Sequence, residues 1–108
     1  MSDTQKVAII SGCSSGIGLA TAIELARGGY FVYATMRDLS KKTDLEKIVN
    51  DQSLPVRILE MNVDRQETID STISTIMEEK GRIDVVVNNA GFMRMGSLED
   101  TSIEYFEE

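Results

Sequence analysis

The sequence predicts an α/β fold with a doubly wound parallel sheet. Short apolar segments alternate with segments whose apolar residues recur every three or four positions, giving strand, helix, strand, helix, strand, helix, strand. This alternation produces a parallel sheet with right-handed crossovers. A cluster of glycines separates the first strand from the first helix, as the tight turn at that point of such a fold requires. We therefore expect the strand order 3-2-1-4.

The first strand and the first helix are the most clearly marked elements. Residues 6–11, "KVAIIS", are short and almost continuously apolar, which indicates a strand buried on both faces. A helical pattern begins at Gly16 and is stopped by the pair Gly28 and Gly29. Its apolar residues are Leu19, Ala22, Ile23 and Ala26.

The middle of the chain repeats the same pattern. Residues 30–35, "YFVYAT", are aromatic and β-branched and predict the second strand, which a short helix around residues 45–49 follows. Pro55 precedes the third strand, "VRILEMNV". Asp64 is the expected N-cap of the next helix, with Glu67 three residues on, and that helix should end near Gly81.

The last third contains one further strand, "IDVVV" at residues 83–87. A loop with "NNAG" and "FMRMG" follows it, and "TSIEYFEE" at residues 101–108 has the pattern of the opening turns of a helix. We therefore expect the chain to end within that helix. The fourth strand would then have an apolar edge with no partner strand.

Composition excludes several classes of function. Eleven Lys and Arg against eighteen Asp and Glu give a net charge of −7, which disfavours nucleic acid and anionic membranes as partners. With one cysteine, Cys13, and no histidine, neither an internal disulfide nor an ordinary zinc site is expected, and the metal set is empty. No targeting or membrane-spanning pattern is present, so we expect a cytoplasmic protein.

The glycine cluster "SGCSSGIG" at residues 11–18 is the main candidate site. It joins a buried strand to an apolar helix, where unpaired backbone N–H groups and the helix dipole attract an anion. Gly12 would permit the tight turn, Gly16 would let the backbone approach a pyrophosphate, and Gly18 would let the helix pack closely on the sheet. A turn that binds nothing is the alternative.

Two motifs together resemble a known family. The spacing Gly-x-x-x-Gly-Ile-Gly in the first loop and "NNAG" at residues 88–91 resemble the short-chain dehydrogenase/reductase family, over the whole chain. The hydroxysteroid and retinol dehydrogenase branch is the most similar. The resemblance implies a single Rossmann-like domain over residues 1–108, truncated before the later strands. It also implies a nicotinamide cofactor, with its pyrophosphate held by Gly12, Gly16, Ile17 and Gly18 and the floor beneath it formed by Asn89, Ala90 and Gly91.

The end of the second strand, "ATMRD", bears on which cofactor binds. NAD-binding members of such folds place an acid there for the ribose 2′-hydroxyl, whereas an arginine suits a 2′-phosphate. By family register Met36 occupies the acid's position and Arg37 follows it, so we expect NADP in preference to NAD. Ser14 and Ser15 could add hydroxyl contacts to the same phosphate. Asp38 could instead favour NAD, if the strand ran one residue longer.

A third cofactor position departs from the family pattern. Members of the family usually have an Asp before a Val at the end of the third strand, where it contacts the adenine amino group, and this chain has Asn62 before Val63. An asparagine can still accept that hydrogen bond through its carbonyl oxygen. Asn62 and Val63 therefore join the expected cofactor residues.

The catalytic groups of the family are absent from this chain. The resemblance implies a serine and a Tyr-x-x-x-Lys pair as proton-handling groups, and none of Tyr30, Tyr33 and Tyr105 is followed by lysine at that spacing. We assign no catalytic residue here and expect no turnover by these residues alone. The implied reaction of the complete protein, expected to be a homo-oligomer, is hydride transfer between NADP and a small alcohol or carbonyl substrate.

Two alternatives stay open at this point. The chain could be a non-catalytic nucleotide-binding module, or a piece that completes a partner chain. A flavodoxin-like domain that binds another phosphate ligand is a further reading, which "NNAG" argues against.

Overall fold

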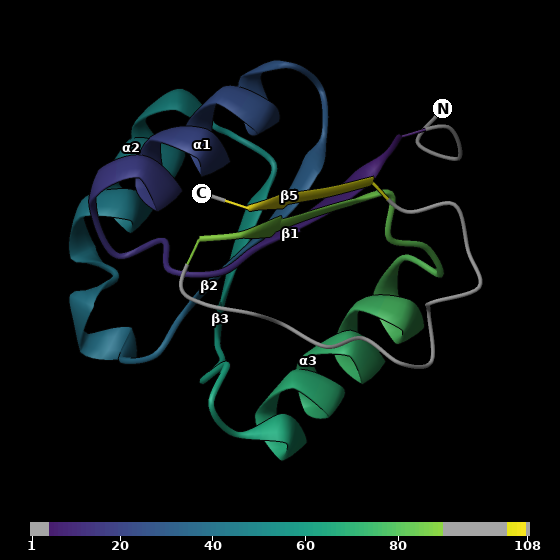
Figure 1. Cartoon of the computed structure of the whole chain (residues 1–108). Helices are drawn as coiled ribbons and strands as arrows, with labels where there is room; N and C mark the ends of the chain where they lie inside the picture. The colour runs from purple at the N-terminus through teal and green to yellow at the C-terminus, as the bar shows by residue number, and fades with distance from the viewer. Residues whose placement is uncertain (1–4, 90–103, 108) are drawn as a thin grey trace.

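The computed structural model describes residues 5–89 and the backbone of residues 104–107. It contains a five-stranded parallel sheet in the order β3-β2-β1-β4-β5 (Figure 1). The strands are β1 (Val7–Ile10), β2 (Phe31–Met36), β3 (Val56–Glu60), β4 (Val85–Asn88) and β5 (Glu104–Glu107). The helices are α1 (Gly16–Arg27), α2 (Thr43–Gln52) and α3 (Gln66–Glu79), with a short 3-10 helix at Leu39–Lys41. The predicted order 3-2-1-4 is confirmed.

The central strand β1 is buried on both faces. All four of its residues are at most 1% exposed. It pairs in parallel with β2 on one side and β4 on the other, so that Ala8 lies opposite both Val32 and Val85. A continuously apolar run is what such a position requires, because neither face of the strand meets water.

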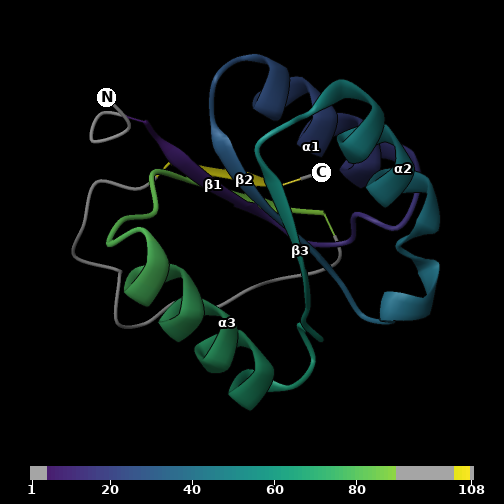
Figure 2. The ribbon, with the colours of Figure 1, turned by 180° about the vertical axis from the view of Figure 1, so that it is seen from behind.

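The helices form a layer on each side of the sheet. Figures 1 and 2 show α1 and α2 on one side and α3 on the other. Alternate side chains of β1 supply the two cores: Ala8 and Ile10 pack with the α1 and α2 side, whereas Val7 and Ile9 pack with α3. Because each helix follows a strand of a parallel sheet, all three helices begin at the same edge, beyond the carboxyl ends of the strands.

The amino edge of the sheet is closed by Asp84. Its carboxylate accepts hydrogen bonds from the backbone N–H of Val7, at 2.8 Å, and from the guanidinium of Arg82. The hydrogen bond from Arg82, and then that from Val7, hold the pKa of Asp84 below its ordinary value. Asp84 thereby connects the start of β1 to the segment that precedes β4.

Two expectations about the elements are wrong. The segment expected to open a helix contains β5, whose backbone pairs in parallel with β4, with Val86 opposite Tyr105. The expected bare edge of β4 is accordingly absent. The second error concerns α3, which begins at Gln66, so Asp64 is not its N-cap.

The remaining boundaries differ from the expected ones by a few residues. The helix α1 begins and ends where the glycines predict, and the backbone N–H of Gly28 donates to the Glu24 and Leu25 carbonyls. The helix α2 is longer than expected at both ends. Within the part of the chain that the structure describes, no helix is long and apolar enough to cross a membrane.

Candidate cofactor site

The loop between β1 and α1 adopts a backbone that favours glycine at two points. Gly12 has a φ of 72° and Gly16 a φ of 63°, both in the left-handed region. A Cβ built on Gly16 meets no atom within 4 Å, so the space over the start of α1 is open. The strain at Gly16 therefore comes from the backbone angle alone, and the open side is available to a ligand.

Gly18 is required for a different reason, namely close packing. A Cβ at this position would collide with the carbonyl oxygen of Gly12 and lie 2.5 Å from the side-chain nitrogen of Asn89. The helix thus sits directly against the loop and against the end of β4. No side chain larger than hydrogen fits here without moving the backbone.

Asn89 fastens the loop from the neighbouring strand. Its Nδ2 donates to the carbonyl oxygen of Gly12 at 2.9 Å, and its backbone N–H donates to the hydroxyl of Ser11 at 3.0 Å. The two motifs that carry the family resemblance are therefore in direct contact. Ala90 and Gly91, the rest of the second motif, lie outside the described residues.

The strand β2 holds the loop from the other side. The backbone N–H of Cys13 donates to the carbonyl of Thr35 at 3.0 Å, and the hydroxyl of Thr35 donates to the carbonyl of Ile10 at 2.8 Å. The backbone N–H of Ser11 also donates to Val87 on β4, at 3.1 Å. The first three residues of the loop are thereby attached to both neighbouring strands.

The N-terminus of α1 has the properties of an anion site. Ser15 is its N-cap residue, but its side chain makes no capping hydrogen bond, and the first turn has no acidic residue. The early N–H groups of the helix and its positive dipole end therefore face the open loop. Ser15, Gly16 and Ile17 are exposed there, Ile17 by 61%.

A cavity of about 240 Å³ adjoins this loop. It combines residues of the glycine loop, the residue that follows β2 and the turn after β3. Its lining is Ser11, Gly12, Ser14, Arg37, Met61, Asn62, Val63 and Asp64. Five of the expected cofactor residues, from three separate segments, are thus brought together, as expected for the carboxyl edge of a doubly wound sheet.

Arg37 is the first residue after β2, and its side chain is 74% exposed. Its described ion pair is with Asp64, whose Oδ2 lies 3.9 Å from Nη1. The neighbouring Asp38 caps the 3-10 helix, because its carboxylate accepts the backbone N–H of Ser40 at 2.9 Å. The hydrogen bond from Ser40 lowers the pKa of Asp38. The strand ends at Met36 and does not extend to Asp38.

The turn after β3 is held by its own side chains. The Oδ1 of Asn62 accepts the backbone N–H of Asp64 at 2.9 Å. The hydroxyl of Thr68 accepts the N–H of Asn62 at 3.0 Å and lies 2.8 Å from its carbonyl oxygen. Asp64 is thus part of a turn stabilised by Asn62, and α3 begins after this turn, with Arg65 at the N-cap position.

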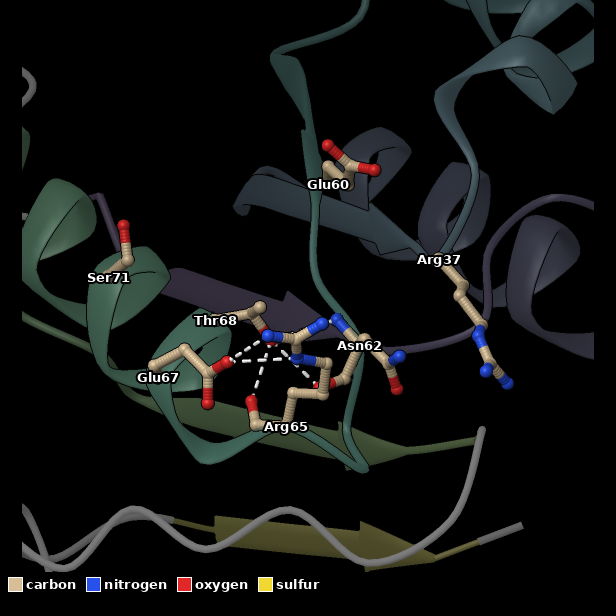
Figure 3. A pocket seen from close by; sticks show the side chains of 7 residues that line it. All are labelled: Arg37, Glu60, Asn62, Arg65, Glu67, Thr68 and Ser71. Carbon is tan, nitrogen blue, oxygen red and sulfur yellow. Dashed lines mark hydrogen bonds and ion pairs between the residues drawn. The ribbon is translucent and has the colours of Figure 1, made fainter.

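A second, larger cavity of about 570 Å³ is lined by side chains from the end of β3, the turn after it and the start of α3, together with Arg37 (Figure 3). Arg37 and Asn62 line both cavities. In the larger one, Glu67 accepts two hydrogen bonds from the guanidinium of Arg65, at 2.8 and 2.6 Å. The remaining lining residues are Glu60, Thr68 and Ser71.

Sequence patterns did not reveal two residues of this region. Thr68, which fastens the turn, and Asp64, which faces Arg37, depend on contacts between segments that no local motif encodes. Among the described residues, no three His, Cys, Asp or Glu side chains gather as metal ligands would.

Comparison with known proteins identifies the family. The family model described as short chain dehydrogenase matches residues 6–108. The chain belongs to the short-chain dehydrogenase family. Its sequence is 40% identical over 107 residues to retinol dehydrogenase 8 of Bos taurus, an alignment that covers 95% of this chain and 34% of that protein.

Solved short-chain dehydrogenases share the fold. A metagenomic short-chain oxidoreductase in complex with NADP matches with a TM-score of 0.74 and 31% identity, covering 81% of this chain and 39% of the other. A 3-ketoacyl-(acyl-carrier-protein) reductase from Brucella melitensis, complexed with NADH, matches with a TM-score of 0.69 and 28% identity, covering 81% and 34%. The chain thus spans about a third of the length of these relatives.

Proposed function

We propose that residues 1–108 are the N-terminal, cofactor-binding portion of an NADP-dependent short-chain dehydrogenase. The complete protein would transfer a hydride between NADP and a small alcohol or carbonyl compound. The observation that carries this proposal is the cavity that Arg37 shares with Gly12 and Ser14 of the loop leading into the uncapped start of α1. Both features select a ligand with more than one phosphate group.

The pyrophosphate would lie over the start of α1. Gly12, Gly16, Ile17 and Gly18 would hold it through backbone contacts, which the open side of Gly16 and the absence of a capping side chain support. Gly12 would also shape the loop through its positive φ, and Gly18 would do so because a Cβ there would collide with the loop backbone. The uncapped start of α1 and its open side therefore support a dinucleotide phosphate at this position.

The adenosine would occupy the smaller cavity. Asn62 and Val63 line it, and the second lone pair of the Asn62 carbonyl oxygen can accept the adenine amino group while the first accepts the N–H of Asp64. Asn89 supports this region by holding Gly12, and we assign Ala90 and Gly91 to the adjoining floor from the family motif.

The 2′-phosphate would be bound by Arg37. Ser14 lines the same cavity and can donate its hydroxyl, whereas Ser15 is exposed on the helix side of the loop and is the weaker candidate. Preference for NADP over NAD is supported by the position of Asp38, whose carboxylate is occupied by the cap of the 3-10 helix. Arg37 is thus the better placed of the two side chains to meet the ribose.

The bound nicotinamide would supply or accept the hydride. The residues described here would bind and orient the cofactor, and we expect the serine and the Tyr-x-x-x-Lys pair to lie in sequence that the chain does not include. We also propose a cytoplasmic location and, on the family resemblance, a homo-oligomeric state for the complete protein.

Removal of the Arg37 charge tests the proposal. In the complete protein, Arg37→Gln should weaken NADPH binding by about tenfold or more, since a hydrogen bond to a charged group contributes about 1.5–3 kcal/mol. NADH binding should change by less than about twofold, because NADH lacks the phosphate that the guanidinium contacts. Titration of the nicotinamide fluorescence measures both affinities. Lys47→Gln is the matched control, because it removes one positive charge from the exposed face of α2.

Two results would contradict the proposal. If Arg37→Gln leaves the affinity for NADPH unchanged, the guanidinium does not bind the 2′-phosphate. If the wild-type protein binds neither NADPH nor NADH at millimolar concentration, the glycine loop is not a dinucleotide site.

A further inference from the structure

We propose that Asp64 is a specificity-determining residue that competes with the cofactor's 2′-phosphate for the guanidinium of Arg37. Asp64 would thereby limit the preference of this site for NADP over NAD. The inference rests on the proposed function, because it concerns the same cavity. It assigns a role to an acidic side chain that the family motif at Asn62 and Val63 does not include.

Asp64 lies beside the two side chains proposed to bind the 2′-phosphate. Asp64, Arg37 and Ser14 all line the cavity of about 240 Å³. The Asp64 carboxylate lies 3.9 Å from the Arg37 guanidinium, which is within ion-pair range but too long for a hydrogen bond. The ion pair between Asp64 and Arg37 is therefore weak.

The turn fixes the backbone that carries this carboxylate. Asn62 accepts the backbone N–H of Asp64, Thr68 holds the N–H of Asn62, and the N–H of Arg65 donates to the Asn62 carbonyl at 2.9 Å. These hydrogen bonds hold the backbone of the turn in place. A phosphate at Arg37 would therefore displace the Asp64 carboxylate by rotation of the exposed Asp64 side chain.

The other charged groups nearby have different partners or positions. Arg65 is bound by Glu67 through two short hydrogen bonds, and both line the larger cavity (Figure 3). Glu60 also belongs to that larger cavity. Among the described residues, Asp64 is the one carboxylate that lines the smaller cavity together with Arg37.

Charge sets the direction of the effect. A phosphate monoester carries a charge of about −1.5 to −2 at neutral pH, so it is repelled by the Asp64 carboxylate and must share or take over the guanidinium. Both side chains are about three-quarters exposed, so water and salt screen the interaction. Exposed ion pairs of this kind correspond to about a two- to fivefold change in affinity.

The test compares two nucleotides that differ only in the 2′-phosphate. In the complete protein, Asp64→Asn should raise the affinity for 2′,5′-ADP by about two- to fivefold and leave that for 5′-AMP unchanged, as measured by calorimetry. At about 1 M salt, where the Debye length is about 3 Å, the gain should disappear. Asp70→Asn, which removes an exposed charge one turn into α3, controls for net charge and should change neither affinity.

A second variant separates competition from a general effect on the turn. In an Arg37→Gln background, Asp64→Asn should raise the affinity for 2′,5′-ADP less than it does with Arg37 present. The inference is overturned if Asp64→Asn lowers that affinity, leaves it unchanged, or raises the affinities for both nucleotides equally. Failure of the wild-type protein to bind either nucleotide would instead contradict the proposed function.

Discussion

The helices α1 and α3 begin at the same edge of the sheet but differ in the acidic residues of their first turns. The first turn of α3 contains Glu67, and the backbone N–H of this residue, followed by the Arg65 side chain, lowers the pKa of its carboxyl. The first turn of α2 likewise contains Asp44 and Glu46. The first turn of α1 has no acid and no capping side chain.

This difference makes α1 the one of these three helices whose first turn has no carboxylate of its own. A positive helix end attracts negative charge wherever it comes from, and α2 and α3 meet that need with their own carboxylates. At α1 the sequence supplies only glycines and an exposed isoleucine. Under the proposed function, the open side of Gly16 would leave room for a ligand's phosphate at the helix end, where α3 has Glu67.

The largest expected effect comes from filling the space at Gly18. In Gly18→Ala the new methyl group would collide with the Gly12 carbonyl, which is backbone and cannot rotate away. We expect the free energy of unfolding to fall by about 1–3 kcal/mol, as for other overpacked sites, and nucleotide binding to be lost because α1 moves off the loop. Chemical denaturation and NADPH titration measure the two effects.

Gly28→Ala is the matched control for this substitution. Gly28 has an ordinary φ of −79°, and its nearest backbone neighbour lies 3.4 Å from the position of a new Cβ. Its stability should change by less than about 1 kcal/mol. Equal losses at both glycines would show that the close approach at Gly18 has no special importance.

An intermediate effect is expected when α1 is given the acid that α3 already has. Ile17 is 61% exposed, so Ile17→Glu should leave the fold intact or raise its melting temperature slightly, through the helix dipole. The same carboxylate should reduce the affinity for NADPH by about tenfold, because it occupies the positive end and repels the pyrophosphate. Fluorescence titration and thermal melting give the two readouts.

In Ile17→Gln the new side chain has nearly the shape of glutamate but no charge. This variant therefore separates the electrostatic effect on NADPH binding from the effect of losing the apolar side chain. It should weaken binding much less than Ile17→Glu. If the two variants bind equally weakly, the anion-attracting character of α1 is not what holds the cofactor.

The smallest effect is expected when the acidic residue in the first turn of α3 is removed. Glu67→Gln should lower the melting temperature at neutral pH and leave NADPH affinity unchanged. The pKa of Glu67 is below its ordinary value of 4.5 in the folded state, so its contribution is complete above that pH and is lost as the pH falls through the folded pKa. The stability difference between wild type and variant should therefore shrink on acidification. A difference that persists at pH 2 would contradict this assignment.

The sequence was sufficient for the elements whose structure is set locally. The apolar runs predicted β1 and β4, which are buried, and β-branched, aromatic and aliphatic residues predicted β2 and the partly exposed β3. The glycines predicted the first loop, because a positive φ at Gly12 and Gly16 and the contact at Gly18 tolerate few other residues. Arg37 follows the end of β2 and lines a cavity with Gly12 and Ser14, whereas its binding of a 2′-phosphate stays a prediction.

The errors arise where distant contacts decide the outcome. The segment Glu104–Glu107 has a helical pattern of charges, but its backbone pairs with the available edge of β4. Asp64 has the residue type and spacing of a helix N-cap. In the structure it belongs instead to a turn in which the Asn62 side chain accepts its backbone N–H. The approach of Asp64 to Arg37 joins the ends of two strands, and no spacing within one segment reveals it.

The attachment of the glycine loop to both neighbouring strands has a thermodynamic consequence for binding. Ordering one residue of a flexible loop costs about 1–2 kcal/mol of conformational entropy. Here Ser11, Gly12 and Cys13 are held by Val87, Asn89 and Thr35, so folding itself has already restricted them. A dinucleotide would then bind a preorganised loop, and little of the interaction free energy would be lost to ordering these three residues on binding.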